Sequence, residues 1–216
     1  MKLVDLHNHT SFSYDGSNTP EEVIEHAIAE KIDVIGITDH QFSVKDEFSE
    51  YCERLGRCKA RYGGRIDMKC GLEIGTRPKP NDFLASNAHR LDFCLFESLD
   101  SPVGMDLFEF FEWRRLFSCP VGLAHTDIFS LSKRYGLNVP RELAKRDIFW
   151  EINTSGNYDY YYDFLTNDRK RALVRESRVM LSIGSDTHWI REYQGGKVRR
   201  ANHLASELGN PVLFGE

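Results

Sequence analysis

Seven short apolar runs alternate with segments that have the hydrophobic spacing of helices. The runs occupy 2–6, 34–38, 66–72, 91–96, 121–124, 148–152 and 179–183. Strands of a parallel sheet are buried on both faces and therefore read as nearly continuous apolar runs. Strands that are separated by helical segments predict repeated βα units and a parallel sheet.

The clearest helical segment follows the first run, at 20–28. Thr19 suits the N-cap, Pro20 suits the first helical position, and Glu22 completes a capping box. Apolar side chains then recur at helical spacing, which gives this helix one buried face. Further helices are predicted at 46–62, 105–117, 140–146, 168–177 and 198–208, with a less regular pattern at 82–89.

Seven βα units in a chain of 216 residues favour a closed or nearly closed barrel over an open sheet. The predicted fold class is therefore α/β with parallel strands. The sequence contains no linker, low-complexity tract or break in composition, so residues 1–216 are predicted to form a single domain.

The composition narrows the class of protein. An apolar fraction of 41% is typical of a soluble globular protein, and a net charge of -5 does not favour a nucleic-acid partner unless a local basic patch overrules it. The five cysteines form no CxxC pair and lie in or beside apolar segments, which indicates reduced thiols in a cytoplasmic protein. No run approaches the roughly 20 apolar residues of a membrane helix, and the first run is too short for a cleaved signal.

Histidine and acidic residues follow almost every predicted strand. His7 and His9 end the first run two positions apart, where strand alternation directs both imidazoles to one face. The later residues of this kind are Asp15, Asp39, His40, Glu73, Glu97, Asp100, His125, Asp127, Asp186 and His188, with Asn153 after the sixth run. Because the C-terminal ends of parallel strands meet at one mouth of a barrel, we expect these side chains to gather there. The other histidines, His26, His89 and His203, lie in helical segments and are expected to face solvent.

Imidazole and carboxylate ligands without cysteine suit Zn²⁺, Mn²⁺ or Fe²⁺ better than Mg²⁺ or Ca²⁺ alone. The set is too large for one ion, which favours a cluster of two or three. Clustered cations lower the pKa of a bound water and polarise a substrate oxygen, which is typical of hydrolases.

Five short motifs carry most of these residues. In chain order they are His7-Asn8-His9-Thr10 with Tyr14-Asp15-Gly16, Ile37-Thr38-Asp39-His40, Gly71-Leu72-Glu73, Ala124-His125 and Ser185-Asp186-Thr187-His188. In this combination and order, the sequence resembles the PHP (polymerase and histidinol phosphatase) superfamily of metal-dependent phosphoesterases. The resemblance implies a distorted (β/α)7 TIM-like barrel, in agreement with the seven runs.

The resemblance also implies a ligand set. His7, His9, Glu73 and Asp186 would hold a first metal and act as the catalytic residues; Asp15, His40 and His188 would hold a second; Glu73 would bridge to a third, which His125 also binds. Some relatives have histidine at the position of Asp15, where a carboxylate is also an acceptable ligand. The family usually has a further histidine after the fourth strand, and this chain has none there. Either Glu97 or Asp100 replaces it, or the third site is weak or empty.

The hypothesis for the chemistry is in-line attack of a metal-bound hydroxide on phosphorus. Arg134 and Arg191 are the preferred phosphate-binding residues, because a guanidinium binds phosphate through two hydrogen bonds and both follow metal-bearing strands. The other candidates are Arg77, Lys79 and Lys133, each of which could equally be a solvated surface charge, and Asn153, which could support a ligand or contact substrate. The aromatic residues of 158–164 are expected to form the apolar face of a helix, with Tyr158 at the rim of the site.

The leading functional prediction is a phosphoesterase for a small phosphorylated substrate, similar to a histidinol-phosphatase. Two other hydrolases remain open: a phosphodiesterase or nuclease, which needs a basic groove with aromatic side chains, and an amidohydrolase, which usually has a bridging lysine carbamate where this chain has Glu73. A non-catalytic, metal-binding regulatory domain is the alternative from another class. The sequence does not define the oligomeric state.

Overall fold

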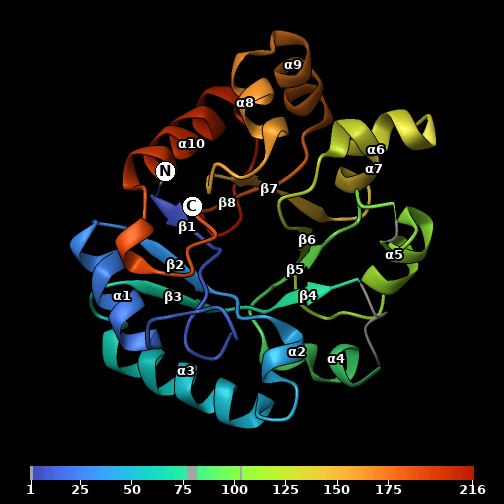
Figure 1. The fold of residues 1–216 in the computed structure, drawn as a ribbon. Coiled ribbons are helices and arrows are strands. Elements are labelled where there is room, and N and C mark those ends of the chain that lie inside the picture. The colour runs from blue at the N-terminus through green and yellow to red at the C-terminus, as the bar shows by residue number, and fades with distance from the viewer. Residues whose placement is uncertain (1, 77–81, 103) are drawn as a thin grey trace.

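The computed structural model describes residues 2–76, 82–102 and 104–216. Figure 1 shows its strands around the centre of the molecule, with the helices outside them. In the described residues the parallel strands are β1 (Val4–Asp5), β2 (Val34–Ile37), β3 (Asp67–Cys70), β4 (Glu73–Gly75), β5 (Cys94–Glu97), β6 (Val121–Leu123), β7 (Ile148–Asn153) and β8 (Leu181–Gly184). The prediction of an α/β fold with parallel strands is confirmed.

The strands form two sheets, β1-β2-β3 and β4-β5-β6-β7-β8, which join into a distorted barrel. At one junction, Leu6 N donates to Ile183 O at 2.7 Å and His9 N donates to Thr187 O at 2.9 Å, so the end of β1 pairs with the end of β8. At the other junction, Gly71 N donates to Ile37 O at 2.8 Å and Leu95 N donates to Leu72 O at 2.9 Å.

The predicted strand at 66–72 is interrupted in the structure. A Cβ atom on Gly71 would lie 2.7 Å from the Phe93 ring and 2.7 Å from Thr38 Cγ2, so the backbone passes between two side chains with no room for a third. The strand ends as β3 and resumes as β4 at Glu73. This break is the distortion of the barrel, and it places Glu73 at the start of a separate strand.

The helices cover the outside of the strands. They are α1 (Pro20–Ala29), α2 (Gln41–Val44), α3 (Phe48–Tyr62), α4 (Asp82–Asn87), α5 (Leu107–Arg114), α6 (Ile128–Tyr135), α7 (Val139–Ala144), α8 (Asp159–Thr166), α9 (Asp168–Ser177) and α10 (Gly195–Leu208), with the 3-10 turns η1 (Ala88–Arg90) and η2 (Ile190–Glu192). Every predicted helix is present. Three short elements, α2, α6 and η2, occupy segments for which no helix is predicted.

Helix α1 forms as the sequence predicts. Glu22 N donates to Thr19 Oγ1 at 3.3 Å and Thr19 N donates to Glu22 Oε2 at 2.8 Å, which completes the capping box. Val23, Ile24 and Ala27 are buried against the strands. Burial of a large aliphatic side chain stabilises a fold by roughly 1.5–3 kcal/mol, so packing of this face outweighs the intrinsic stability of a helix of this length.

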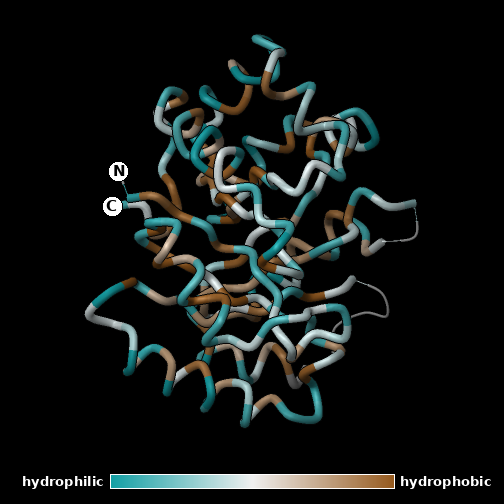
Figure 2. Tube along the Cα trace, turned by 60° about the vertical axis from the view of Figure 1, so that its left-hand side comes forward, coloured by the Kyte–Doolittle hydropathy of each residue, from teal (hydrophilic) through white to brown (hydrophobic). Residues whose placement is uncertain are grey.

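Figure 2 shows hydrophobic residues along the inner strands and hydrophilic residues toward the outer helices and loops. Phe93, Phe96 and Trp150 are fully buried in the core. All five cysteines are free, and four of them are buried, as predicted for reduced thiols. His89 and His203 are exposed, but His26 is half-buried because its ring packs edge-on against Tyr193, at 4.9 Å between centroids.

Candidate metal centre

The polar residues that follow the strands gather at one end of the barrel, where His7, His9 and Glu73 are buried and His188 is half-buried. His7 and His9 continue β1 and point to the same side, with 3.1 Å between their Nε2 atoms. Asn8 points the other way, and its Nδ2 donates to Gly36 O at 3.2 Å. The alternation predicted from the sequence therefore brings the two imidazoles together.

We use the name inner group for His7, His9, Glu73, His125 and Asp186. His7 Nε2 lies 3.4 Å from Glu73 Oε1 and 3.5 Å from Asp186 Oδ1, and His9 Nε2 lies 3.5 Å from Asp186 Oδ1. Zinc–ligand distances of about 2.0–2.1 Å place tetrahedral ligand atoms about 3.3–3.4 Å apart. The ligand atoms of His7, His9 and Asp186 all lie within 4.8 Å of one another, a spacing that fits a single divalent ion.

Glu73 links the other residues of the inner group to His40. Its Oε1 is 2.9 Å from His125 Nε2, and its Oε2 is 2.9 Å from His40 Nδ1. His9 Nε2 lies 3.5 Å from Oε2. One carboxylate thus touches four histidines, an arrangement that suits a ligand shared between ions.

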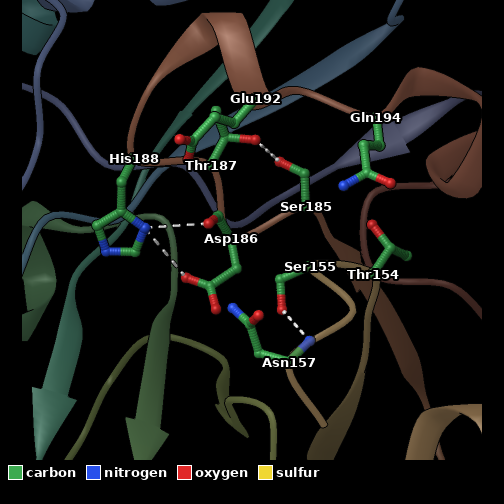
Figure 3. Close-up of a pocket in the computed structure, with 9 residues that line it drawn as sticks. All are labelled: Thr154, Ser155, Asn157, Ser185, Asp186, Thr187, His188, Glu192 and Gln194. Carbon is green, nitrogen blue, oxygen red and sulfur yellow. Dashed lines mark hydrogen bonds and ion pairs between the residues drawn. The ribbon is translucent and has the colours of Figure 1, made fainter.

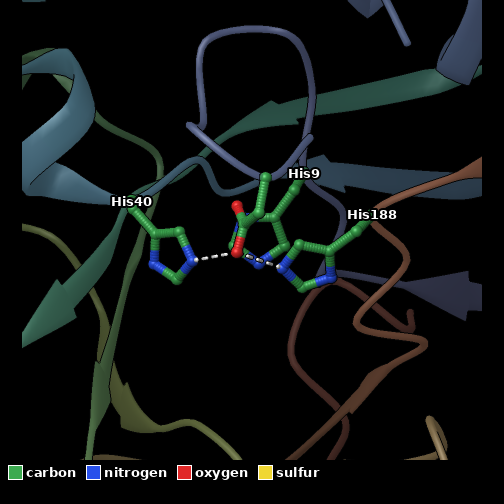
Figure 4. Close-up of side chains that lie close together, drawn as sticks. His9, His40 and His188 are labelled. Atoms are coloured by element: carbon green, nitrogen blue, oxygen red, sulfur yellow. Dashed lines mark ion pairs between the residues drawn. The ribbon is translucent and has the colours of Figure 1, made fainter. Parts of the chain in front are cut away.

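We use the name rim group for Asp15, His40 and His188. Asp15 Oδ2 lies 3.5 Å from His40 Nε2 and 3.4 Å from His188 Nε2. Figure 4 shows His9 between His40 and His188, and the His9 ring stacks on that of His188 with 4.0 Å between centroids. The ligand atoms of His9 and the rim group all lie within 4.8 Å of one another.

The loop that carries Asp15 is held in place by Asp39. Thr10 N and Ser13 Oγ each donate to Asp39 Oδ1 at 2.7 Å, and Thr10 Oγ1 donates to Asp39 Oδ2 at 2.7 Å. A Cβ atom on Gly16 would lie 1.9 Å from Thr10 O, so only glycine permits this turn. Asp39, which the sequence places beside His40, therefore supports the loop and does not face the cluster.

The electrostatics of the inner group favour a cation. Burial opposes charge on His7, but the carboxylates of Glu151, Glu73 and Asp186 outweigh it and hold the pKa of His7 well above its usual value. Burial also opposes charge on His125, yet contact with Glu73 raises its pKa to about 9. Burial likewise opposes ionisation of Glu73, but His7 and the contacts with His125 and His40 hold its pKa well below the usual range. The carboxylates therefore remain ionised and attract protons or metal ions.

Unpartnered polar atoms at the cluster test whether metal ions fit. His40 Nδ1 is buried and makes no hydrogen bond with any residue that the structure describes, although Glu73 Oε2 is 2.9 Å away. Asp15 Oδ1 is also buried without a partner among the described residues. A divalent cation would satisfy such atoms, and the mixed nitrogen and oxygen donors are the ligands that zinc, manganese and iron accept. The residues therefore fit metal ions.

The two candidates for the missing histidine differ in position. A carboxylate oxygen of Glu97 lies within 4.8 Å of ligand atoms of His40 and Glu73. Burial and the charge of Glu73 raise the pKa of Glu97, as expected for two neighbouring acids. Asp100 Oδ2 instead accepts a hydrogen bond from Asp127 N at 2.9 Å, which ties it to the loop before α6.

The two preferred phosphate-binding arginines, Arg134 and Arg191, contact residues outside the inner and rim groups. Arg134 lies on α6, and its guanidinium donates to the backbone oxygens of Leu99, Asp100 and Ser101. It therefore braces the loop after β5. Arg191 is exposed, with its guanidinium 5.0 Å from the centre of the Trp189 ring. Lys133 is exposed, whereas Arg77 and Lys79 lie outside the described residues.

Two residues of β7 support the inner group from behind. Asn153 Nδ2 donates to Glu151 Oε2 at 3.1 Å and to Asp186 Oδ2 at 3.3 Å. Glu151, whose Oε1 lies 2.7 Å from His7 Nδ1, was not predicted as a site residue. The sequence does contain a pattern that predicts this position, because Glu151 is two positions before Asn153 and strand alternation places both on the inner face.

The aromatic run after β7 divides as expected. Tyr160, Tyr161 and Phe164 form the buried face of α8. Tyr158 precedes the helix and stacks on His125, with 4.7 Å between ring centroids and 6° between planes. It forms one wall of the inner group.

A cavity of about 480 Å³ adjoins the cluster. Its lining residues come from the segments after β7 and β8 and from the start of α10: Thr154, Ser155, Asn157, Ser185, Asp186, Thr187, His188, Glu192 and Gln194. In Figure 3, Asp186 and His188 lie on one side of this group, and Thr154 and Gln194 lie on the other. None of these nine described lining residues is a lysine or an arginine.

The fold and the cluster define a parallel α/β barrel with a histidine- and carboxylate-rich centre at the C-terminal ends of its strands, which is where such barrels carry out chemistry. The model of the PHP domain family matches residues 5–196, and the chain belongs to this family. Within the described residues, every helix is too short or too polar to cross a bilayer.

The relatives of the chain include histidinol-phosphatases. The histidinol-phosphatase of Lactococcus lactis subsp. lactis (strain IL1403) is 28% identical over 254 aligned residues, which cover 97% of this chain and 92% of the relative. The crystal structure of histidinol phosphate phosphatase from the same organism, complexed with zinc, L-histidinol and phosphate, has a TM-score of 0.71 and 17% identity, covering 98% of this chain and 95% of that one. A candidate histidinol phosphatase from Listeria monocytogenes has a TM-score of 0.62 and 17% identity, covering 87% and 96%. At this identity, the two structural likenesses establish the fold.

Proposed function

We propose that this chain is a metal-dependent phosphomonoesterase that hydrolyses a small phosphorylated alcohol, with histidinol phosphate as the leading substrate. The observation that carries the proposal is the group of ligand atoms of His7, His9 and Asp186, which lie within 4.8 Å of one another, beside Glu73 and next to a cavity that Asp186 lines. The near full-length similarity to a histidinol-phosphatase supports the choice of substrate. We further propose that residues 1–216 act as one domain.

The proposed cofactors are two or three divalent ions, of zinc, manganese or iron. The inner residues His7, His9, Glu73 and Asp186 would hold the first ion, and the rim group would hold the second. Glu73, His125 and Glu97 would hold a third, with Glu97 in place of the family's histidine. When bound, such ions lower the pKa of water and stabilise the negative charge that develops on phosphoryl oxygens.

The residues of the chain keep this centre dry and fixed. The His7 and His9 side chains are 0% exposed and the Glu73 side chain is 1% exposed, so the ligand charges act in a medium of low dielectric constant, where electrostatic interactions are strong. Because the described lining of the cavity contains no lysine or arginine, compensation of the phosphate charge falls to the ions that these ligands hold.

The cavity suits an alcohol that presents hydrogen-bond donors. Thr187 Oγ1 donates to Ser185 Oγ at 2.7 Å, Ser185 Oγ donates to Asn8 Oδ1 at 3.2 Å, and Ser155 Oγ donates to Asn153 Oδ1 at 2.7 Å. These hydroxyl protons point into the protein, which leaves oxygen lone pairs for the cavity. The carboxylate of Glu192 adds a further acceptor. A nucleic-acid strand would instead require cations and stacking aromatic rings, which the described lining does not supply.

The test is elemental analysis of the purified protein together with hydrolysis of histidinol phosphate, an aryl phosphomonoester and the matching aryl phosphodiester. We expect bound transition metal, faster hydrolysis of the monoesters, and loss of hydrolysis after chelation. Faster hydrolysis of the diester would favour the phosphodiesterase alternative. Bound metal without turnover of any ester would favour a regulatory metal-binding domain.

A further inference from the structure

A buried carboxylate in β7 touches two residues of the inner group from behind. The Glu151 side chain is 1% exposed. Its Oε1 lies 2.7 Å from His7 Nδ1, and its Oε2 accepts a hydrogen bond from His125 N at 2.7 Å. A Cβ atom on Gly184 would lie 2.1 Å from Oε1, so the neighbouring strand leaves space for this carboxylate only because glycine stands there.

The contact with His7 determines which ring nitrogen carries the proton. An ionised carboxylate can only accept hydrogen bonds, so His7 must donate through Nδ1. Nε2 then faces His9, Glu73 and Asp186, which lie within 3.5 Å of it, and is the nitrogen that a metal ion would bind. This is the tautomer that a metal ion requires at Nε2.

The contact with His125 holds a strained backbone. His125 has a φ of 27°, a backbone conformation that residues other than glycine rarely adopt. Its N–H is anchored on Glu151, while its Nε2 reaches Glu73 Oε1 at 2.9 Å. The same carboxylate also accepts from Asn153, which in turn donates to Asp186. Three candidate ligands therefore depend on one buried acid.

We propose that Glu151 is the positioning residue of the metal centre: it fixes the tautomer of His7 and the placement of His125, and so sets the affinity of the inner group for metal. The proposal rests on the proposed function only in that the inner group binds metal. Hydrolysis of a phosphoester is not required for it.

The test is Glu151→Gln in the full chain, with zinc affinity measured by competition against a chromophoric chelator. The amide can still accept from His125 N through its oxygen, but its NH₂ group then faces His7 Nδ1 and forces the ring proton to Nε2. We expect zinc affinity to fall by about 10- to 100-fold, the usual effect of losing such a partner. Long-range proton–nitrogen NMR correlations of the His7 ring should show the change of tautomer.

Two further variants separate positioning from a general effect of buried charge. Glu151→Asp keeps the charge but is too short to reach both partners, so we expect reduced affinity here as well. Asp5→Asn removes another fully buried carboxylate, one that accepts hydrogen bonds from the backbone of Ser185, at 2.8 Å from Oδ1, and of His7. Its zinc affinity should match that of the wild type.

The outcomes are distinguishable. Zinc affinity within twofold of wild type in both Glu151 variants, with the His7 tautomer unchanged, would overturn the positioning role while leaving the proposed function intact. A wild-type chain that binds no zinc, manganese or iron would overturn both. Tight metal binding without phosphatase activity would remove only the proposed function. If Glu151→Gln does not fold, the comparison of Glu151→Asp with Asp5→Asn decides the question.

Discussion

The inner and rim groups contain the same residue types but differ in how firmly the protein holds them. In the inner group, both histidines that follow β1 are held at Nδ1, His7 by Glu151 at 2.7 Å and His9 by Ser13 Oγ at 3.1 Å. In the rim group, the Asp15 and His188 side chains are each 31% exposed, and Asp15 Oδ1 has no hydrogen-bond partner. A ligand that is already oriented loses less conformational entropy when it binds metal.

Burial and orientation, as well as residue type, therefore determine the role of a ligand. Buried, fixed ligands act in a low dielectric and bind an ion tightly, whereas exposed ligands compete with water. We therefore expect the inner group to retain its ion and the rim group to exchange it.

The largest effect is expected from loss of an inner ligand. Asp186→Ala and His9→Ala should each reduce phosphoester hydrolysis by about 10²–10³-fold or more, because loss of one group that stabilises a transition state already costs this much. Steady-state kinetics at saturating metal measure the effect, and circular dichroism checks that the fold is retained. Near wild-type turnover in either folded variant would refute the role of the inner group.

A rim ligand should matter less. Asp15→Asn should lower bound metal by about one equivalent and reduce hydrolysis by roughly tenfold to a hundredfold, since the inner ion still polarises the substrate. Stepwise chelation of the wild type should remove the same equivalent first, as followed by elemental analysis. Loss of all metal in a single step would contradict the distinction between the two groups.

The pH dependence of stability should reverse with metal. In the metal-free chain, burial opposes the charge on His125 but contact with Glu73 raises its pKa to about 9, above the ordinary value of 6.5. A raised histidine pKa stabilises the fold below the unfolded value and loses this contribution as pH rises to the folded value. The melting temperature of the metal-free chain should therefore fall between about pH 6.5 and pH 9.

Zinc should invert that slope. Zinc binds the neutral imidazole, so a rise in pH over the same range strengthens binding and stabilises the fold. Thermal melts with zinc and with chelator, in matched buffers, measure both slopes. Parallel slopes would show that His125 is not among the ligands.

The sequence predicts the barrel well because most strands lie in short, largely apolar runs that alternate with helical segments. It does not reveal that the run at 66–72 breaks at Gly71, since the break depends on Phe93 and Thr38, which are distant in the chain. Helix α6 was also missed. Asp127 caps it by accepting hydrogen bonds from Phe129 N and Ser130 N at 3.0 Å. The sequence contains this capping residue, but its position after a strand favours interpreting it as a candidate site residue.

The cluster itself was predictable because parallel strands end at one mouth, so position along the chain translates into position in space. The partners of individual side chains were not. Arg134 was expected on a loop facing phosphate, but it lies on a helix and bonds to three backbone oxygens. The partner of a side chain depends on local hydrogen-bond geometry, which the periodicity of the sequence does not encode.

The smallest effect concerns Glu97, which lies between the two groups. Glu97→Gln removes a carboxylate that neighbours Glu73 and His40, so it should weaken the third ion by about tenfold, or about 1.4 kcal/mol, and leave the first two in place. Asp100→Asn is the matched control, because Asp100 already bonds to Asp127 N and its amide can keep that contact. Metal titrations followed by calorimetry compare the two variants. Equal affinities in both would assign the third ion to Glu73 and His125 alone, whereas a loss in Asp100→Asn only would make Asp100 the replacement for the family's histidine.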